Sequence, residues 1–316
     1  MKGLLSDKKA FIAGIVSAVL LSVMRIIQLI SCTEYPSLLY AQGSEIFNTE
    51  FSILLILSAV VITVLAYYDV KHTKAGTAAD LSEKGCNVFG IVMILAGAVW
   101  ILPVISDFSA GAVGLGTMIS LACCIAYLVG GMTMMSTSKI VPAHCISAIF
   151  IIINYLIVAV KFYLSSPIIT GMPQKITMMM FYVLTILFWI NLGRFMCGGE
   201  KKFTRTALIA SGYFCTASAL AHIIGCYALL AADSEKWAAI AQNSPETLPD
   251  LEIMVTALVP AVLAAVVQFS KKRETVSDNT QPDSDAASEK ATEEIADTPD
   301  TTADKAQNST EEDTQD

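Results

Sequence analysis

The feature that most constrains this chain is a succession of eight apolar runs, each about as long as a lipid bilayer is thick. The hydrocarbon core of a bilayer is about 30 Å deep, so a helix needs roughly 20 apolar residues to cross it. Backbone amides in lipid must bond within their own segment, which makes such runs helical. The sequence therefore predicts an all-α, polytopic membrane helix bundle. Its eight transmembrane helices are expected at about residues 10–31, 51–69, 87–107, 112–134, 143–163, 177–197, 207–231 and 251–269.

Charge divides the chain into two unlike parts. Only 15% of all residues are charged, against roughly 25% in a typical soluble domain. Residues 274–316 nevertheless hold fourteen Asp or Glu and two Lys, with almost no large apolar side chain. Such a segment cannot bury enough surface to offset chain entropy. The predicted domains are a transmembrane domain over 1–273 and a disordered acidic cytoplasmic tail over 274–316.

Lysine and arginine mark alternate connections between the predicted helices. They precede the first helix, follow the eighth and fill every second connection: Lys2, Lys8, Lys9, Lys71, Lys74, Lys84, Lys139, Lys201, Lys202, Arg205, Lys271, Lys272 and Arg273. The other connections hold only Lys175 and Lys236 as basic residues and are otherwise acidic. The positive-inside rule then places both termini in the cytoplasm, as an even helix count also requires. The expected location is the cytoplasmic membrane of a bacterium.

Ionisable and polar side chains inside the predicted helices are the candidate ligand-binding residues, because they cost free energy in lipid. Arg25 lies about fifteen residues into the first helix, and Gln28 follows one turn later on the same face. Lys161 in the fifth helix and His222 in the seventh fall at a similar depth. If these helices meet, the four residues form an outward-facing cationic pocket that binds an anion. The alternatives are snorkelling of the long side chains, or neutralisation by Glu34, Glu45, Glu50 or Glu252 that makes the layer structural.

No complete catalytic or metal-binding set is visible. Tyr68–Asp69 and Gly114–Gly116 are similar to the motif pair of intramembrane aspartyl proteases, but Thr117 stands where the second aspartate belongs. Neither HExxH, GxSxG nor a GK[ST] phosphate loop occurs. The eight cysteines form no CxxC pair, and the methionine clusters have no His or Cys at the spacing of metal ligands. We therefore interpret the cysteines and methionines as packing residues. We expect no cofactor and no metal, and a membrane enzyme is the least favoured function class.

The N-terminal helix has a second interpretation. A basic start, an apolar stretch and Leu29–Cys32 loosely match the cleavage box of a lipoprotein signal peptide. Against this, Arg25 interrupts the apolar stretch, which is also longer than the 7–15 residues usual for signal peptides. Processing at Cys32 would leave the predicted topology after that residue unchanged. Within the helices, Asn154 and Asn191 are expected to bond neighbouring helices.

The helix order also suggests a weak internal repeat. The first and fifth predicted helices have the same orientation, and superposing Arg25 on Lys161 aligns their starts to within a residue. Two four-helix halves of equal orientation would be parallel repeats, as some transporters have. Chance similarity between apolar helices is the competing explanation.

One family resemblance bears on the architecture. The stretch Arg25–Leu29, followed by an acidic outer loop with Pro36 and Tyr40, resembles the first helix of a group of uncharacterised multipass membrane proteins of anaerobic Gram-positive bacteria. Residues 160–212 are similar to their second half. The first outer loop of that group often reads Asp-x-x-Thr-Gly-Phe, whereas residues 33–38 read Thr-Glu-Tyr-Pro-Ser-Leu here. The resemblance implies an eight-helix architecture and no activity.

Three function classes follow from these features. The repeat and the cationic layer favour a secondary transporter or permease-like protein for a small anionic solute. The acidic tail favours a membrane sensor or scaffold that recruits a cytoplasmic protein partner through residues 274–316. A membrane enzyme is the third class. The lipid bilayer is the expected environment in every case, and nothing points to nucleic acid.

Overall fold

Eight helices in the described part of the chain are long and apolar enough to cross a membrane. The structure is a computed structural model that describes residues 8–34, 39, 41, 43–72, 81–137, 142–165, 173–197, 202–243 and 245–269. The helices are α2 (Lys9–Ser31), α3 (Glu45–His72), α4 (Glu83–Ser109), α5 (Leu115–Thr137), α6 (Pro142–Ser165), α7 (Pro173–Met196), α8 (Lys202–Ala232) and the pair α10 (Leu251–Thr256) and α11 (Val259–Phe269). The prediction of an all-α, eight-span bundle is confirmed, and the chain is a multi-pass membrane protein.

Residues 1–274 form one compact unit of the chain, and residues 275–316 are separate from it in sequence and lie outside the described residues. All described helices belong to the first unit. The predicted acidic tail and its role in recruiting a partner fall outside the described residues. We call the end of the bundle where α3, α5, α7 and α11 finish the basic end, after the lysines and arginines of its connections.

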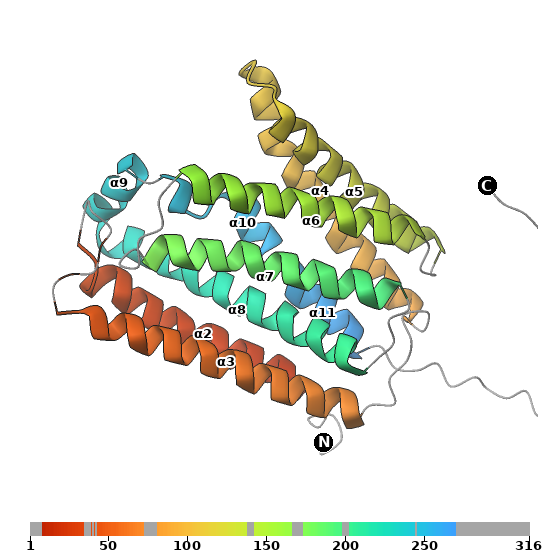
Figure 1. Cartoon of the computed structure of the whole chain (residues 1–316), viewed down its shortest axis with the longest axis horizontal. Helices are drawn as coiled ribbons and strands as arrows, with labels where there is room; N and C mark the ends of the chain where they lie inside the picture. The colour runs from red at the N-terminus through yellow and green to blue at the C-terminus, as the bar shows by residue number, and fades with distance from the viewer. Residues whose placement is uncertain are drawn as a thin grey trace, which may run out of the picture. The chain divides into compact units, whose positions relative to one another are not determined.

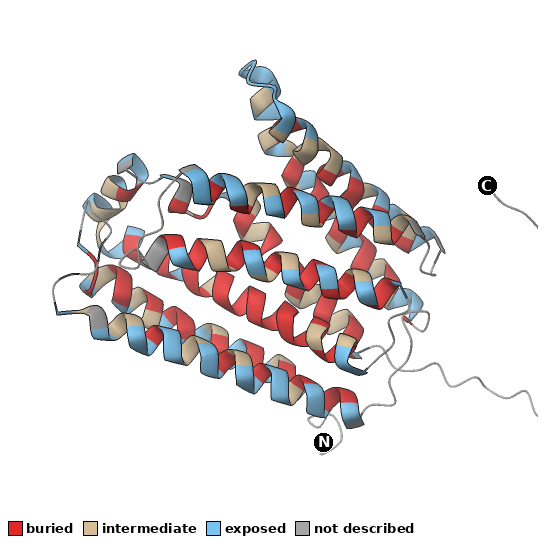
Figure 2. Cartoon of the chain, in the orientation of Figure 1, coloured by how far each residue is buried: buried red, intermediate tan, exposed pale blue. Residues whose placement is uncertain are grey.

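Helix α8 is the central helix of the bundle. It packs against α2, α3, α7, α9 (Ser234–Asn243) and α11, and Figure 2 shows its middle turns buried while α3 exposes one side along its length. Small residues allow this close packing. A Cβ atom added to Gly225 would lie 2.7 Å from Cγ of Arg25, and one added to Gly212 would lie 2.6 Å from Cβ of Ala264. The glycines of α8 therefore allow neighbouring helices to pack closely around it.

The packing of the described helices does not divide into a first and a second four. Helices α2 and α3 pack together and against α8, whereas α4 and α5 pack together, with α5 against α6 and α4 against α10 and α11. A parallel repeat that pairs α2 with α8 would pair α6 with α4. The structure packs the backbone of α6 between α5 and α7, and α6 reaches α4 through the rings of Tyr155 and Trp100. The expected halves therefore do not form separate units.

The eighth span is broken in its middle, which the apolar pattern did not predict. Helix α10 ends at Thr256 and α11 begins at Val259, because Pro260 has no N–H to donate to the carbonyl four residues earlier. Thr216 of α8 fills the gap: its hydroxyl donates to the Ala257 carbonyl at 2.7 Å and accepts from the Ala261 N–H at 3.1 Å. A side chain of the central helix thus satisfies the freed backbone groups, as lipid burial requires.

A buried network ties four helices at the basic end. The Asp69 carboxylate of α3 accepts from the backbone N–H of Ala10 in α2 at 2.9 Å and from the Gln268 amide of α11 at 2.8 Å. The Tyr213 hydroxyl of α8 donates to the side-chain oxygen of Gln268, Oε1. Thr117, by contrast, lies in the first turn of α5 at the opposite end and donates to Asp107 at 2.7 Å. The two halves of the protease-like motif are therefore at opposite ends of the bundle.

A short helix that the sequence did not predict follows α8. Helix α9 begins after Asp233, whose carboxylate accepts from the Lys236 N–H at 3.1 Å and lies 3.5 Å from the Lys236 ammonium. The Lys236 N–H hydrogen bond, aided by the nearby ammonium charge, lowers the pKa of Asp233. The Lys236 ammonium also donates to the Ile30 carbonyl at 3.2 Å, which fastens α9 to the end of α2. The helix is amphipathic and too short to cross a bilayer.

Candidate functional site

Three of the four predicted ligand-binding residues come together between α2, α3 and α8. Arg25 and Gln28 are fully buried and His222 is 2% exposed. Arg25 Nη1 donates to Gln28 Oε1 at 3.0 Å, and Gln28 Nε2 donates to the Phe47 carbonyl of α3 at 3.2 Å. The Arg25 guanidinium lies 6.0 Å from the centroid of the Phe51 ring, a cation–π distance.

His222 is fixed in one tautomer. Its Nε2 lies 2.9 Å from the carbonyl of Thr247, in the short helix η2 (Pro245–Thr247). A carbonyl only accepts, so Nε2 carries the proton and neutral His222 leaves Nδ1 as an acceptor. Nδ1 has no hydrogen-bond partner among the described residues. Cys226 Sγ, one turn later on α8, lies 3.7 Å from Nε2. The cluster thus links α2, α3, α8 and the segment before α10.

Lys161 lies apart from this cluster. It is exposed on α6, and α6 packs against α5 and α7. Its ammonium rests against the start of α5, since a Cβ added to Gly116 would lie 2.1 Å from Lys161 Nζ. The structure therefore separates the predicted layer into a buried group of three and one exposed cation. A ligand-binding role for the four residues stays a prediction.

Lys161 lines a cavity of about 450 Å³ between α6, α7 and the segment before α10, whose wall is mostly apolar. The polar residues of its wall are Lys161, Tyr182 and Asp250. The Asp250 carboxylate caps α10 by accepting from the Ile253 N–H at 2.7 Å. Tyr182 packs edge-on against Phe162, with ring centroids 5.7 Å apart. The cavity lies at the end of the bundle opposite the basic end, and its charges are of both signs.

Sequence reasoning did not predict a second group, which we call the donor cluster: Trp100 of α4 and Asn154 and Tyr155 of α6. It named Asn154 only as a residue that bonds a neighbouring helix. The three side chains are 3%, 1% and 1% exposed. Trp100 Nε1, Asn154 Nδ2 and the Tyr155 hydroxyl make no well-formed hydrogen bond among the described residues. The hydroxyls of Thr256 and Tyr127 lie near that of Tyr155, and the Cys123 thiol lies near Asn154. The Trp100 and Tyr155 rings meet edge to face at 5.6 Å. Ser120 of α5 donates to Asn154 Oδ1 at 3.3 Å, which leaves the Asn154 amide N–H groups as donors.

The cavity and the donor cluster are neighbours along two helices. Val158 and Ile253 line the cavity, and each is three residues, about one helical turn, from a residue deeper in the bundle, Tyr155 and Thr256. The Thr256 hydroxyl of α10 lies within hydrogen-bonding reach of the Tyr155 hydroxyl, and the Glu252 carboxyl acts on it electrostatically. Buried donors that lack an acceptor cost free energy unless a partner binds. The arrangement therefore suits a ligand rich in hydrogen-bond acceptors.

Two sequence signals could have found this site. Asn154 is a polar residue in the middle of a span, and Pro260 is a proline inside the eighth span, where a break in the backbone hydrogen bonding is expected. Trp100 and Tyr155 gave no signal, because aromatic residues are common in membrane helices. Searches against protein-family models, curated proteins and solved structures find no match to this chain. The conclusion that it is a multi-pass membrane protein therefore depends on its own sequence and structure.

Proposed function

We propose that the protein is a secondary transporter or permease-like protein for a small anionic solute. The observation that carries the proposal is the donor cluster. Its three buried donors come from two helices, make no well-formed hydrogen bond among the described residues and lie about one turn below the cavity beside Lys161. Anions accept hydrogen bonds strongly, and charge-assisted bonds are about twice as strong as neutral ones. In this proposal Lys161 contacts the solute at the cavity, and Trp100, Asn154 and Tyr155 bind it inside.

The broken eighth span supports the same proposal. Discontinuous helices next to midplane binding sites recur in secondary transporters, because freed backbone groups and half-helices can rearrange around a solute. Glu252 and Thr256 of α10 border the donor cluster on the side of the break. An ionised Glu252 would repel a bound anion, so the proposal requires that the Glu252 carboxyl is protonated while the anion is bound.

Arg25, Gln28 and His222 receive a different role in this proposal. They are buried between α2, α3, α8 and η2. The segment from Thr247 to Asp250 connects them to the cavity, because His222 bonds Thr247 and Asp250 lines the cavity. We assign them the anchoring of that segment, so that the cavity wall keeps a fixed position relative to α2 and α8. The three residues then influence solute binding through the position of Asp250 and α10.

The proposal also includes an orientation and a location. The basic end faces the cytoplasm of a bacterial cell, and the cavity beside Lys161 opens outward. This follows from the bias of Lys and Arg in the connections. It makes the cavity the entry point for uptake.

Uptake into liposomes tests the proposal. Purified protein is reconstituted and offered radiolabelled inorganic phosphate, sulfate, lactate and succinate. We expect uptake of at least one anion, and a fall of about tenfold or more for Tyr155→Phe, because a hydrogen bond to a charged group contributes about 1.5–3 kcal/mol. Tyr163→Phe is the matched control, since Tyr163 is on the same helix, is 57% exposed and points away from the bundle.

Two results would count against the proposal. Wild-type protein that takes up none of the four anions above the rate of empty liposomes would contradict anion transport. Equal uptake by Tyr155→Phe and Tyr163→Phe would be compatible with anion transport, but it would show that the donor cluster does not bind the transported anion. Both variants are first compared by thermal unfolding in detergent, so that a folding defect is not counted as a transport defect.

A further inference from the structure

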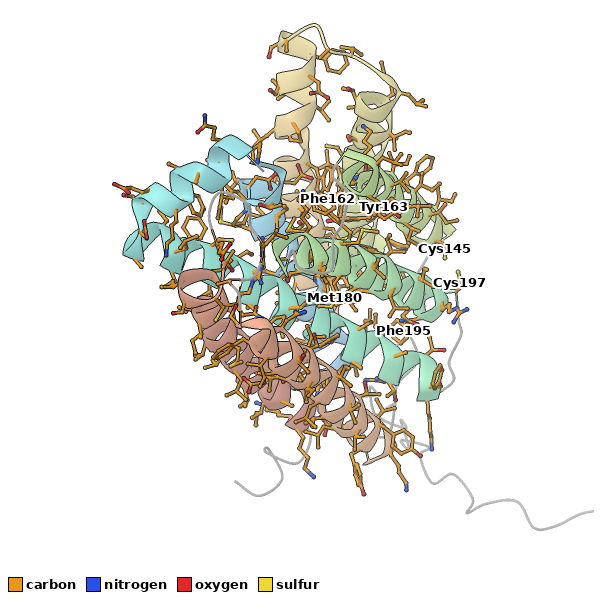
Figure 3. The ribbon with its side chains drawn as sticks, turned by 60° about the vertical axis from the view of Figure 1, so that its left-hand side comes forward. Cys145, Phe162, Tyr163, Met180, Phe195 and Cys197 are labelled. Carbon is orange, nitrogen blue, oxygen red and sulfur yellow. The ribbon has the colours of Figure 1, made fainter. Side chains whose placement is uncertain are left out.

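Two thiols that the transport proposal does not use lie against each other at the basic end of the bundle. Cys145 is in the first turn of α6, and Cys197 directly follows α7. Their sulfur atoms are 2.7 Å apart although the residues are 52 positions apart in the sequence, and Figure 3 shows both side chains at the same ends of the two helices. A disulfide bond is about 2.05 Å long. The sulfur atoms therefore need to move by less than about 1 Å to bond.

This pair is also the accessible one. Cys197 is exposed and Cys145 is half-buried, whereas the other six cysteines, all free, are buried: Cys32, Cys86, Cys123, Cys124, Cys215 and Cys226. An oxidant in solution therefore reaches Cys197 first, with Cys145 next to it.

We propose that Cys145 and Cys197 are a redox-modification site that forms a reversible disulfide with a hydroperoxide as oxidant. The Cys197 thiolate attacks the peroxide, giving a sulfenic acid as the O–O bond breaks. The Cys145 thiolate then attacks the Cys197 sulfur and displaces hydroxide. In total two thiols and one hydrogen peroxide give one disulfide and two waters. A dithiol reductant reverses the step by thiol–disulfide exchange.

The bond joins two helices that the transport proposal uses. It would fasten the start of α6 to the end of α7, which pack side by side, and α6 also carries Tyr155 and Lys161. Disulfides in the cytoplasm are mostly transient and redox-sensing, because the compartment is kept reducing. At the basic end this pair therefore fits a switch that holds α6 and α7 together under oxidation.

Peptide mapping after oxidation tests the site. The full-length protein in detergent is treated with a small excess of hydrogen peroxide, remaining thiols are blocked with N-ethylmaleimide, and trypsin is added. Cleavage gives peptides 140–161 and 195–201, each with a single cysteine. We expect these two peptides to be linked in most of the oxidised protein, to separate with dithiothreitol, and to stay unlinked in Cys145→Ser.

Other products would overturn the proposal. These are a Cys197 link between two chains, a Cys197 sulfinic acid without the linked peptides, or unchanged thiols under conditions that oxidise an exposed control cysteine. Ser234→Cys provides that control, because Ser234 is exposed at the opposite end of the bundle. Because the readout is a covalent link, it is independent of whether the protein transports an anion.

Discussion

Replacing Gly212 by alanine should lower the thermal unfolding midpoint of the purified protein by several degrees. A Cβ at this position would lie 2.6 Å from Cβ of Ala264 and 2.7 Å from the Pro260 carbonyl oxygen. Both atoms belong to α11 and are fixed by its backbone. Overpacking of this kind costs about 1–3 kcal/mol, which outweighs the gain of up to about 1 kcal/mol from removing a helical glycine. The measurement is thermal unfolding in detergent.

Gly193→Ala is the matched control. Gly193 is also inside a membrane helix, but its added Cβ would meet only Cβ of Ala148, at 3.7 Å, an ordinary contact distance. Here the helix propensity gain acts without overpacking, so the midpoint should stay or rise. Equal shifts for Gly193→Ala and Gly212→Ala would show that α8 and α11 do not approach as closely as the structure has them.

The second large effect is expected at Arg25. Arg25→Leu removes the donor to Gln28 Oε1 and leaves that oxygen buried, and hydrogen bonds to charged groups contribute about 1.5–3 kcal/mol. We expect a loss of stability of about that size. Gln28→Leu should cost less when Arg25→Leu is already present than in the wild-type background, because the two side chains share one bond. Unfolding of the two single variants and the double variant by denaturant measures the coupling.

Additive effects in this cycle would contradict the Arg25–Gln28 bond. The same variants also separate the two roles that we assign. Arg25→Leu should act first on stability, whereas Tyr155→Phe should act on uptake with little change in stability. A normal midpoint together with lost uptake in Arg25→Leu would instead place Arg25 in the solute path, as the sequence first suggested.

The architecture could be predicted from the sequence because lipid imposes two strong constraints. A span must be apolar over about 20 residues, and its backbone must be bonded internally, so the eight runs translate directly into helices. Counting residues also placed Arg25, Gln28 and His222 in one layer; the structure has them near one another, and their depth in a membrane stays a prediction. Neither result needed knowledge of which helices are neighbours.

The candidate site could not be predicted in the same way, because it depends on which helices are neighbours. Hydrophobicity does not encode that order, since lipid tails and helix faces are equally apolar. Lys161 is predicted at the depth of Arg25, but it lies on α6, which packs against α5 and α7. The donor cluster combines α4 and α6, which are separated by a full helix in sequence. The break at Ala257–Leu258 required the contact with Thr216 as well as the proline. These features are pairwise contacts that a single sequence leaves open.

The most direct test of the account is the side of the membrane on which each end of the bundle lies. Cells are treated with a membrane-impermeant maleimide before and after permeabilisation, with native Cys197 or an introduced cysteine as reporter. Lys84→Cys reports the basic end, and Ala110→Cys and Ser234→Cys report the opposite end; all four positions are exposed, and Cys197→Ser accompanies the three substitutions. We predict labelling of Ala110→Cys and Ser234→Cys in intact cells, and of Cys197 and Lys84→Cys only after permeabilisation. Labelling of Cys197 and Ser234→Cys from the same side would contradict the membrane-spanning arrangement.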